Sequence, residues 1–140
     1  MRLDAGGYVG NTATGALIEG SPNGITIIDG PGTVNNAGTI SGSNYGVWLA
    51  VGGTVIDSGT IISGGGSHYA VYFTGTVGGS NLLVLDPGYK LIGTAHGCTR
   101  ILTPEGEVAL AEIYARILAR AYCAAALSAP SGGSMPRARL

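Results

Sequence analysis

The sequence predicts a mainly β protein: a short right-handed parallel β-helix of three to four rungs, followed by a C-terminal helix and a disordered tail. The first observation is a phrase that occurs twice, as GTVNNAGTISG at 32–42 and as GTVIDSGTIISG at 53–64. The second is that the following segment also recurs, as YGVWL at 45–49 and YAVYF at 69–73. Self-similarity with a period of roughly 20–25 residues is typical of a stacked solenoid, in which each repeat is one rung.

The rungs are predicted to consist of short β-strands rather than helices. Runs of β-branched and aromatic residues at 25–27, 47–49 and 71–73 are separated by Gly, Asn and Ser. No run in the repeats carries apolar residues at i, i+3, i+4 and i+7, which a helical repeat requires. Glycine accounts for 26 of 140 residues and suits the tight corners between strands.

Period-2 alternation predicts which side chains face the core. Thr, Asn and Ser are expected to face water, together with Trp48. The predicted inward residues are Val34, Ile40, Val47, Leu49, Val55, either Ile61 or Ile62, Val71 and Phe73.

Composition divides the chain into five segments. Glycine thins out after about residue 96, and a stretch rich in Ala, Leu, Ile, Glu and Arg predicts a helix that begins near Glu107. The simplest role for such a helix is a cap over the last rung. The predicted segments are a lead-in at 1–15, β-helical repeats at 16–95, a short motif at 96–109, the helix at 110–127 and a disordered tail at 128–140.

Charge and hydropathy exclude several function classes. Only 11% of residues are charged and the net charge is −1, so nothing in the composition favours nucleic-acid binding. No uninterrupted apolar stretch of 18 residues predicts a membrane span, and the first residues do not read as a signal peptide. A polar but weakly charged solenoid suggests an extracellular or cell-surface location for the parent protein. Cys98 and Cys123 lie outside the repeats, and their disulfide state is left open.

The repeat region resembles the β-helical passenger or stalk segments of bacterial autotransporter and filamentous-haemagglutinin-like proteins. Two phrases carry the resemblance: G-T-V-x-N-x-G-T-I-S-G at 32–42 and N-x-L-x-L-x-P-G at 81–88. It covers a little over half of the chain. It implies β-helical rungs, but such rungs occur in adhesins, stalks and polysaccharide-acting enzymes alike.

Residues 99–109 (TRILTPEGEVA) resemble the opening of a Hedgehog/intein (Hint) autoprocessing domain. The resemblance implies β-structure with a turn at 104–106, and an N-to-S acyl shift in which a leading Cys attacks the preceding carbonyl. Thr94 stands where that nucleophile belongs and Cys98 stands at a glycine position. No Thr-x-x-His block, which supplies the assisting imidazole, is present. We interpret the motif as a truncated, degenerate Hint start with Cys98 as the only candidate nucleophile.

The candidate binding residues are four aromatic side chains in the recurring strands. If they stack on one face they could bind sugar rings or a partner, although an aromatic ladder also stabilises neighbouring strands. Asp29, Asp57 and Asp86 are interpreted as turn residues, so no metal or cofactor site is predicted. The four aromatic residues are Tyr45, Trp48, Tyr69 and Tyr72.

Three functions follow from these patterns. The preferred one is a non-catalytic structural or adhesive fragment of a bacterial surface or secreted protein, whose partner would be carbohydrate or a host or cell-surface protein. The alternative is a Hint-type autoprocessing protein that uses Cys98. The third is a polysaccharide-active β-helix, which needs paired carboxylates or a basic partner.

Overall fold

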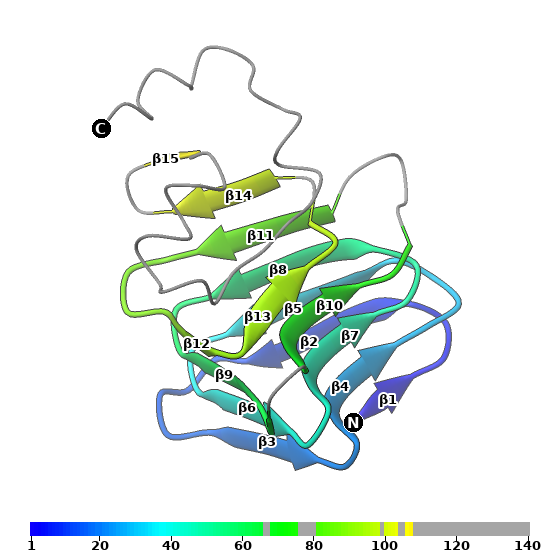
Figure 1. Cartoon of the computed structure of the whole chain (residues 1–140), viewed down its shortest axis with the longest axis horizontal. Helices are drawn as coiled ribbons and strands as arrows, with labels where there is room; N and C mark the ends of the chain where they lie inside the picture. The colour runs from blue at the N-terminus through cyan, green and yellow to red at the C-terminus, as the bar shows by residue number, and fades with distance from the viewer. Residues whose placement is uncertain (66–67, 76–80, 99, 104–105, 108–140) are drawn as a thin grey trace.

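The computed structural model is a parallel β-solenoid of about four turns, in which three sheets enclose one core (Figure 1). The structure describes residues 1–65, 68–75, 81–98, 100–103 and 106–107, the last pair by backbone alone. Each turn contributes one strand to each sheet, and strands of successive turns lie side by side. The prediction of a mainly β, parallel solenoid is therefore confirmed.

The strands fall into three sheets that run the length of the stack. Sheet A consists of β1 (Arg2–Leu3), β4 (Asn23–Ile27), β7 (Tyr45–Leu49), β10 (Tyr69–Phe73) and β13 (Thr94–His96). Sheet B consists of β2 (Gly7–Asn11), β5 (Gly32–Asn36), β8 (Gly53–Asp57), β11 (Asn81–Leu85), β14 (Arg100–Thr103) and β15 (Gly106–Glu107). Sheet C consists of β3 (Leu17–Gly20), β6 (Thr39–Gly42), β9 (Thr60–Ser63) and β12 (Lys90–Ile92).

The two copies of the repeated phrase lie directly on one another. Strand β5 pairs with β8 in parallel, with Val34 opposite Val55. Strand β7 pairs with β10 in the same way, with Trp48 opposite Tyr72. Because the register preserves the sequence alignment, equivalent side chains of successive turns form straight columns, and repeated residues become repeated surfaces.

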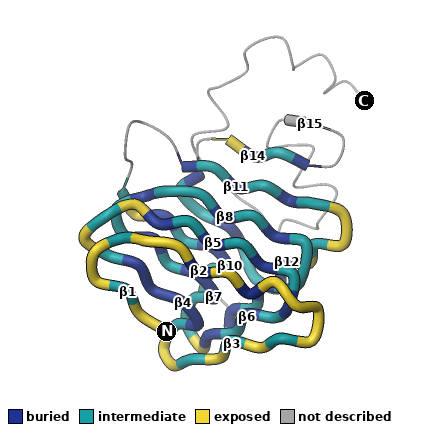
Figure 2. The backbone as a smooth tube through the Cα atoms, turned by 180° about the vertical axis from the view of Figure 1, so that it is seen from behind, coloured by how far each residue is buried: buried dark blue, intermediate teal, exposed yellow. Residues whose placement is uncertain are grey.

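The core contains the apolar side chains for which alternation predicted an inward position. All of them are buried, and at the ambiguous pair Ile61 is fully buried whereas Ile62 is half-buried. Leu83, Leu85 and Ile101 continue the same core into the later turns. Buried and half-buried positions make up the strands from β4 to β11, whereas exposed ones lie mainly in the connecting loops and in the first-turn strands β1, β2 and β3 (Figure 2).

The expectation that Asn, Thr and Ser face water is wrong at several positions. Asn36 and Asn81 are almost completely buried, and Asn11 is 5% exposed. Asn81 spans two corners, because its Nδ2 donates to the carbonyl oxygens of Gly75 and Gly97 at 2.7 and 2.8 Å. These amides are inside because they satisfy corner backbone groups that would otherwise be buried without a partner.

The ends of the described chain differ from the predicted segments. Residues 1–15, expected as a lead-in, contain β1 and β2, which pair with β4 and β5. At the other end β14 pairs with β11 in parallel and with β15 in antiparallel orientation. Glu107, the expected start of the helix, therefore lies in a strand. The predicted helix at 110–127 and tail at 128–140 lie outside the described residues. Among the residues that are described, no helix is long and apolar enough to span a membrane.

Candidate binding face

The outward side of sheet A carries two columns of side chains, which we call the aromatic face. The register places Arg2 opposite Thr26, Thr26 opposite Trp48, Trp48 opposite Tyr72, and Tyr72 opposite His96. The second column follows Asn23 opposite Tyr45 and Tyr69 opposite Thr94. The face therefore changes from polar in the first turn to aromatic in the following turns.

The four predicted aromatic residues are brought together as one cluster. Tyr45 and Tyr69 stack at 5.9 Å between ring centroids, with planes only 13° apart. Tyr72 lies 4.8 Å from each of these rings, and Trp48 stacks on Tyr72 at 6.5 Å. Such centroid distances lie within the range of favourable aromatic pairs. All four rings are only half-buried, so the cluster both packs and remains accessible.

Both columns point outward because each of the strands β4, β7 and β10 has a small residue at its second position. Tyr45 has the alternation parity of Val47, which is fully buried, so simple alternation would place its ring inside. Gly46 between them is buried as well, and a Cβ there would lie 2.4 Å from Cγ2 of the core residue Ile61. The neighbouring turns have Gly24 and Ala70 at this position. Two consecutive inward positions thus reset the alternation and leave Tyr45 and Trp48 on the same outer face.

Trp48 is held in place by a hydrogen bond at the edge of the face. Its indole Nε1 donates to the hydroxyl oxygen of Thr74 at 3.0 Å, and that hydroxyl donates to the carbonyl oxygen of Ala50 at 3.2 Å. The polar N–H of the indole is thus satisfied within the chain, so the half-exposed remainder of the ring is apolar. An apolar ring of this kind suits a ligand with an apolar surface.

Two histidines extend the aromatic face, and sequence reasoning did not single them out. His96 stacks on Tyr69 at 5.0 Å with an interplanar angle of 27°. His68 meets Tyr45 edge-on at 6.5 Å. The position of His96 could have been inferred from the repeat, because it follows the inward Ala95 in the next turn, as Tyr72 follows Val71.

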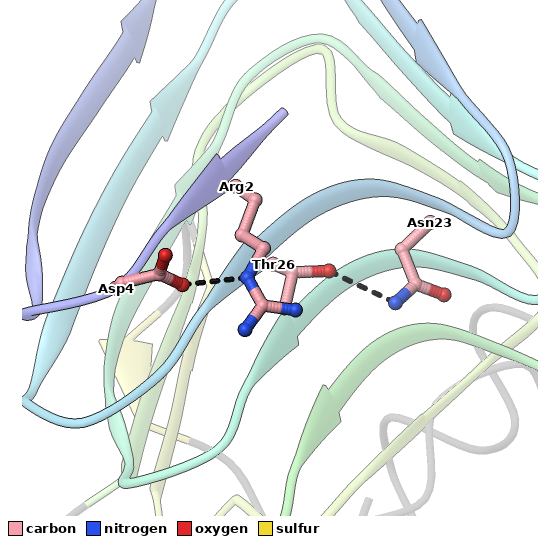
Figure 3. A network of polar contacts seen from close by, with 4 residues as sticks. All are labelled: Arg2, Asp4, Asn23 and Thr26. Carbon is pink, nitrogen blue, oxygen red and sulfur yellow. Dashed lines mark hydrogen bonds and ion pairs between the residues drawn. The ribbon is translucent and has the colours of Figure 1, made fainter.

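The polar end of the face contains a pocket of about 340 Å³ next to Trp48. Asn23 Nδ2 donates to the hydroxyl oxygen of Thr26 at 2.9 Å, and the Arg2 guanidinium pairs with the Asp4 carboxylate (Figure 3). Among the described residues, Asn23 Oδ1 has no hydrogen-bond partner although it is buried. The pocket lining consists of Met1, Arg2, Ser21, Pro22, Asn23, Thr26 and Trp48.

A second column lies in the interior, at the corner between sheets B and C. Asn11 Nδ2 donates to Asn36 Oδ1, and Asn36 Nδ2 donates to Asp57 Oδ1, both at 2.8 Å. The amide N–H groups of Gly38 and Gly59 donate back to Asn36 and Asp57. We call this column, Asn11, Asn36 and Asp57, the amide ladder. Asp57, interpreted from sequence as a turn residue, is instead the last residue of strand β8 and is fully buried.

Asp57 is the unusual member of the amide ladder. Burial raises the pKa of its carboxyl from 3.8 to about 6, in spite of the opposing hydrogen bonds from Asn36 and Gly59. Its Oδ2 is buried without a hydrogen-bond partner in the described part of the chain. The side chain at the same position of the next turn is Leu85, which offers no hydrogen-bonding group.

The remaining candidate, Cys98, lies between β13 and β14. Its side chain is fully buried and its sulfur is disulfide-bonded, so it is not held as an accessible thiolate. Asp86 lies next to Asp57, since its backbone amide donates to the Asp57 carbonyl oxygen at 2.8 Å. Across the described residues, no group of three or more His, Cys, Asp or Glu side chains could hold a metal ion.

Comparisons with known proteins add no identification: no family model, no curated protein and no solved structure matches the chain. The resemblances to autotransporter-type repeats and to a Hint opening therefore stay predictions from the residues.

Proposed function

We propose that this chain is a non-catalytic adhesive segment of an extracellular β-helical protein, and that the aromatic face of sheet A binds carbohydrate. The observation that carries the proposal is the cluster of half-exposed rings: Tyr45, Trp48, Tyr69 and Tyr72. The solenoid supplies a rigid backing, because each strand beneath the cluster is hydrogen-bonded on both sides.

Packing alone accounts for only part of this cluster. Cross-strand aromatic pairs each stabilise a sheet by roughly 0.2–1 kcal/mol, so some benefit is structural. On sheet B, however, the equivalent outward column carries threonine in two successive turns, Thr33 and Thr54, between Tyr8 and Leu82. Because the same solenoid stacks threonine there, its fold does not require large rings on an outer face. Exposed aromatic surface beyond structural need marks an interaction site.

Carbohydrate is favoured over charged partners by the chemistry of the face. Sugar rings present apolar C–H surfaces that stack on aromatic rings, and hydroxyl groups that hydrogen-bond to amides and alcohols. The aromatic face offers both groups, since Asn23 and Thr26 adjoin Trp48. Nucleic-acid binding would instead require clustered cations. In the described part of this face no pair of carboxylates is placed for glycoside hydrolysis, which supports binding over catalysis.

The parent protein is proposed from the repeats. The phrases at 32–42 and 81–88 favour a passenger-type β-helix of a bacterial surface or secreted protein. The motif at 99–109 favours a degenerate Hint start, and the antiparallel pairing of β14 with β15 is the arrangement which that resemblance implies. The buried, disulfide-bonded Cys98 favours loss of self-cleavage.

Affinity electrophoresis in gels that contain soluble polysaccharides tests the binding proposal. We expect at least one neutral or acidic polysaccharide to retard the wild-type chain, and the double variant Trp48→Ala/Tyr72→Ala to migrate freely. Tyr8→Ala is the matched control, because Tyr8 is 59% exposed on sheet B. Circular dichroism verifies that all variants fold. Free migration of the wild type in every gel, or equal retardation of the double variant, would overturn the proposal.

A further inference from the structure

The aromatic face has a direction along the solenoid axis. In the first turn its columns carry the hydrogen-bonding side chains of Thr26 and Asn23, and in the second and third turns they carry stacked rings. Neighbouring strands of a sheet are about 4.8 Å apart, so the rings form a series of platforms at that spacing. A ligand that matches both halves must be flat along its length and rich in hydroxyl groups at one end.

The pocket beside Trp48 lies at the polar end of the aromatic face. Its volume of about 340 Å³ lies at the lower end of the range for small-molecule sites. Asn23 brings one buried amide oxygen that has no partner among the described residues, and Thr26 brings a hydroxyl that already accepts from Asn23 Nδ2. The Thr26 hydroxyl proton can therefore be donated to a ligand oxygen.

Both cations in the pocket lining already have partners within the chain. The Met1 ammonium donates to the carbonyl oxygen of Gly24 at 2.8 Å, and the Arg2 guanidinium donates through Nε to the Asp4 carboxylate. An incoming carboxylate or phosphate would have to compete with Asp4 for this guanidinium and would meet the Asp4 charge at close range. A neutral hydroxylated ligand avoids this competition, because it needs no counter-charge.

We propose that this pocket is the terminal subsite for a neutral, flat, β-linked oligosaccharide, whose chain extends from Thr26 along the rings of Trp48 and Tyr72. This inference rests on the proposed carbohydrate binding and adds the class, direction and end-recognition of the ligand. The terminal sugar hydrogen-bonds to Thr26 and Asn23, and the following units stack on the aromatic columns. The face thus selects hydroxyl-rich ends and extended chains over charged or coiled ones.

Isothermal titration of the full chain with three hexasaccharides tests the inference. The probes are cellohexaose (neutral and flat), maltohexaose (neutral and coiled) and hexagalacturonate (acidic). We expect cellohexaose to bind at least about tenfold more tightly than either of the others, with an affinity that changes less than about twofold up to roughly 0.5 M salt. Thr26→Val removes only the hydroxyl and should weaken cellohexaose binding about fivefold.

The matched control for the hydroxyl is Thr33→Val, because Thr33 lies on the outer side of sheet B, away from the pocket. It should leave the affinity unchanged. Tighter binding of hexagalacturonate, or equal affinities of Thr26→Val and wild type, would overturn the subsite while the wider carbohydrate proposal stands. A loss of all oligosaccharide binding in wild type, together with free migration in polysaccharide gels, would overturn both.

Discussion

The amide ladder and the aromatic face both arise from the sequence repeat, but they have different roles. Both place equivalent side chains of successive turns in one column, from Asn11 to Asp57 inside and from Trp48 to His96 outside. The ladder makes its hydrogen bonds within the chain, largely with corner backbone groups, although Asp57 Oδ2 has no partner among the described residues. The aromatic face leaves large apolar rings half-exposed.

This difference indicates that the repeated residues of the ladder stabilise the fold, whereas those of the aromatic face are available for recognition. A buried amide that is replaced leaves its partners unsatisfied, and each such group costs about 1–3 kcal/mol. A half-exposed ring that is replaced leaves only water in its place. Variants of the ladder should therefore change stability, whereas variants of the aromatic face should change binding with small changes in stability.

Asn36→Ala is expected to give the largest loss of stability. The Asn36 amide contacts Asn11, Asp57, Gly38 and Thr60 through hydrogen bonds of 2.8–3.2 Å. Its removal leaves several buried groups without a hydrogen-bond partner, so we expect the free energy of unfolding to fall by about 4 kcal/mol. Urea denaturation followed by far-UV circular dichroism measures the change.

The neighbouring asparagine provides a matched control. Asn35 lies in the same strand but is only half-buried and points to the outer side of sheet B. Asn35→Ala should change the free energy of unfolding by less than about 0.5 kcal/mol. Similar losses in both variants would show that the ladder adds nothing beyond ordinary strand packing.

Asp57→Asn should stabilise the protein at neutral pH. The pKa of Asp57 is raised to about 6 in the folded chain from 3.8, so its contribution to stability is complete below pH 3.8 and is lost as the pH rises through about 6. Above that range the buried charge costs up to about 3 kcal/mol. Asparagine carries no charge and can continue the ladder, so the variant should gain up to that amount at pH 7–8.

The pH profile of unfolding makes this prediction specific. Wild type should become less stable between pH 4 and 6.5 through this carboxyl, and Asp57→Asn should lack that component of the slope. Asp29→Asn is the control, because Asp29 is exposed and its left-handed backbone (φ 61°) tolerates asparagine. A profile of Asp57→Asn that parallels wild type would mean that Asp57 is not a titrating member of the ladder.

In contrast to the ladder variants, Tyr72→Thr should reduce binding strongly and stability only slightly. The ring of Tyr72 lies 4.8 Å from both Tyr45 and Tyr69, so its loss should cost about 1 kcal/mol of unfolding free energy. Carbohydrate affinity should fall at least about tenfold, because the central platform disappears. Tyr72→Phe keeps the ring and should keep most of the affinity. A loss of stability without a loss of binding would assign the rings to packing alone.

The repeat made most of the fold predictable from sequence. Alternation from Val34 and Val55 identified the core, because aliphatic side chains and strand geometry agree there. The same alternation places Asn36 and Asp57 inward, two positions after those valines, but polarity suggested the opposite. Sequence reasoning failed at the ladder because it considered each polar side chain alone, without the corner amides that satisfy it.

The binding face was predictable in its members but not in its geometry. Tyr45, Trp48, Tyr69 and Tyr72 recur at matching repeat positions, which marked them as a possible ladder. That Tyr45 shares a face with Trp48 depends on the consecutive inward pair Gly46 and Val47, which breaks alternation. The pocket depends on the first turn, because Arg2 reaches it only through the pairing of β1 with β4.

The smallest expected effect concerns the hydrogen bond that fixes Trp48. Trp48→Phe removes the indole donor to the Thr74 hydroxyl at a solvent-exposed site, so the unfolding free energy should fall by about 0.5 kcal/mol. Thr74→Val removes the acceptor, and a double-mutant cycle should return a coupling energy of similar size. Both single variants should weaken carbohydrate binding about twofold, since a ring free to rotate stacks less well. Zero coupling, with both affinities unchanged, would show that the platform does not depend on this bond. In that case the backbone columns alone would orient the aromatic face.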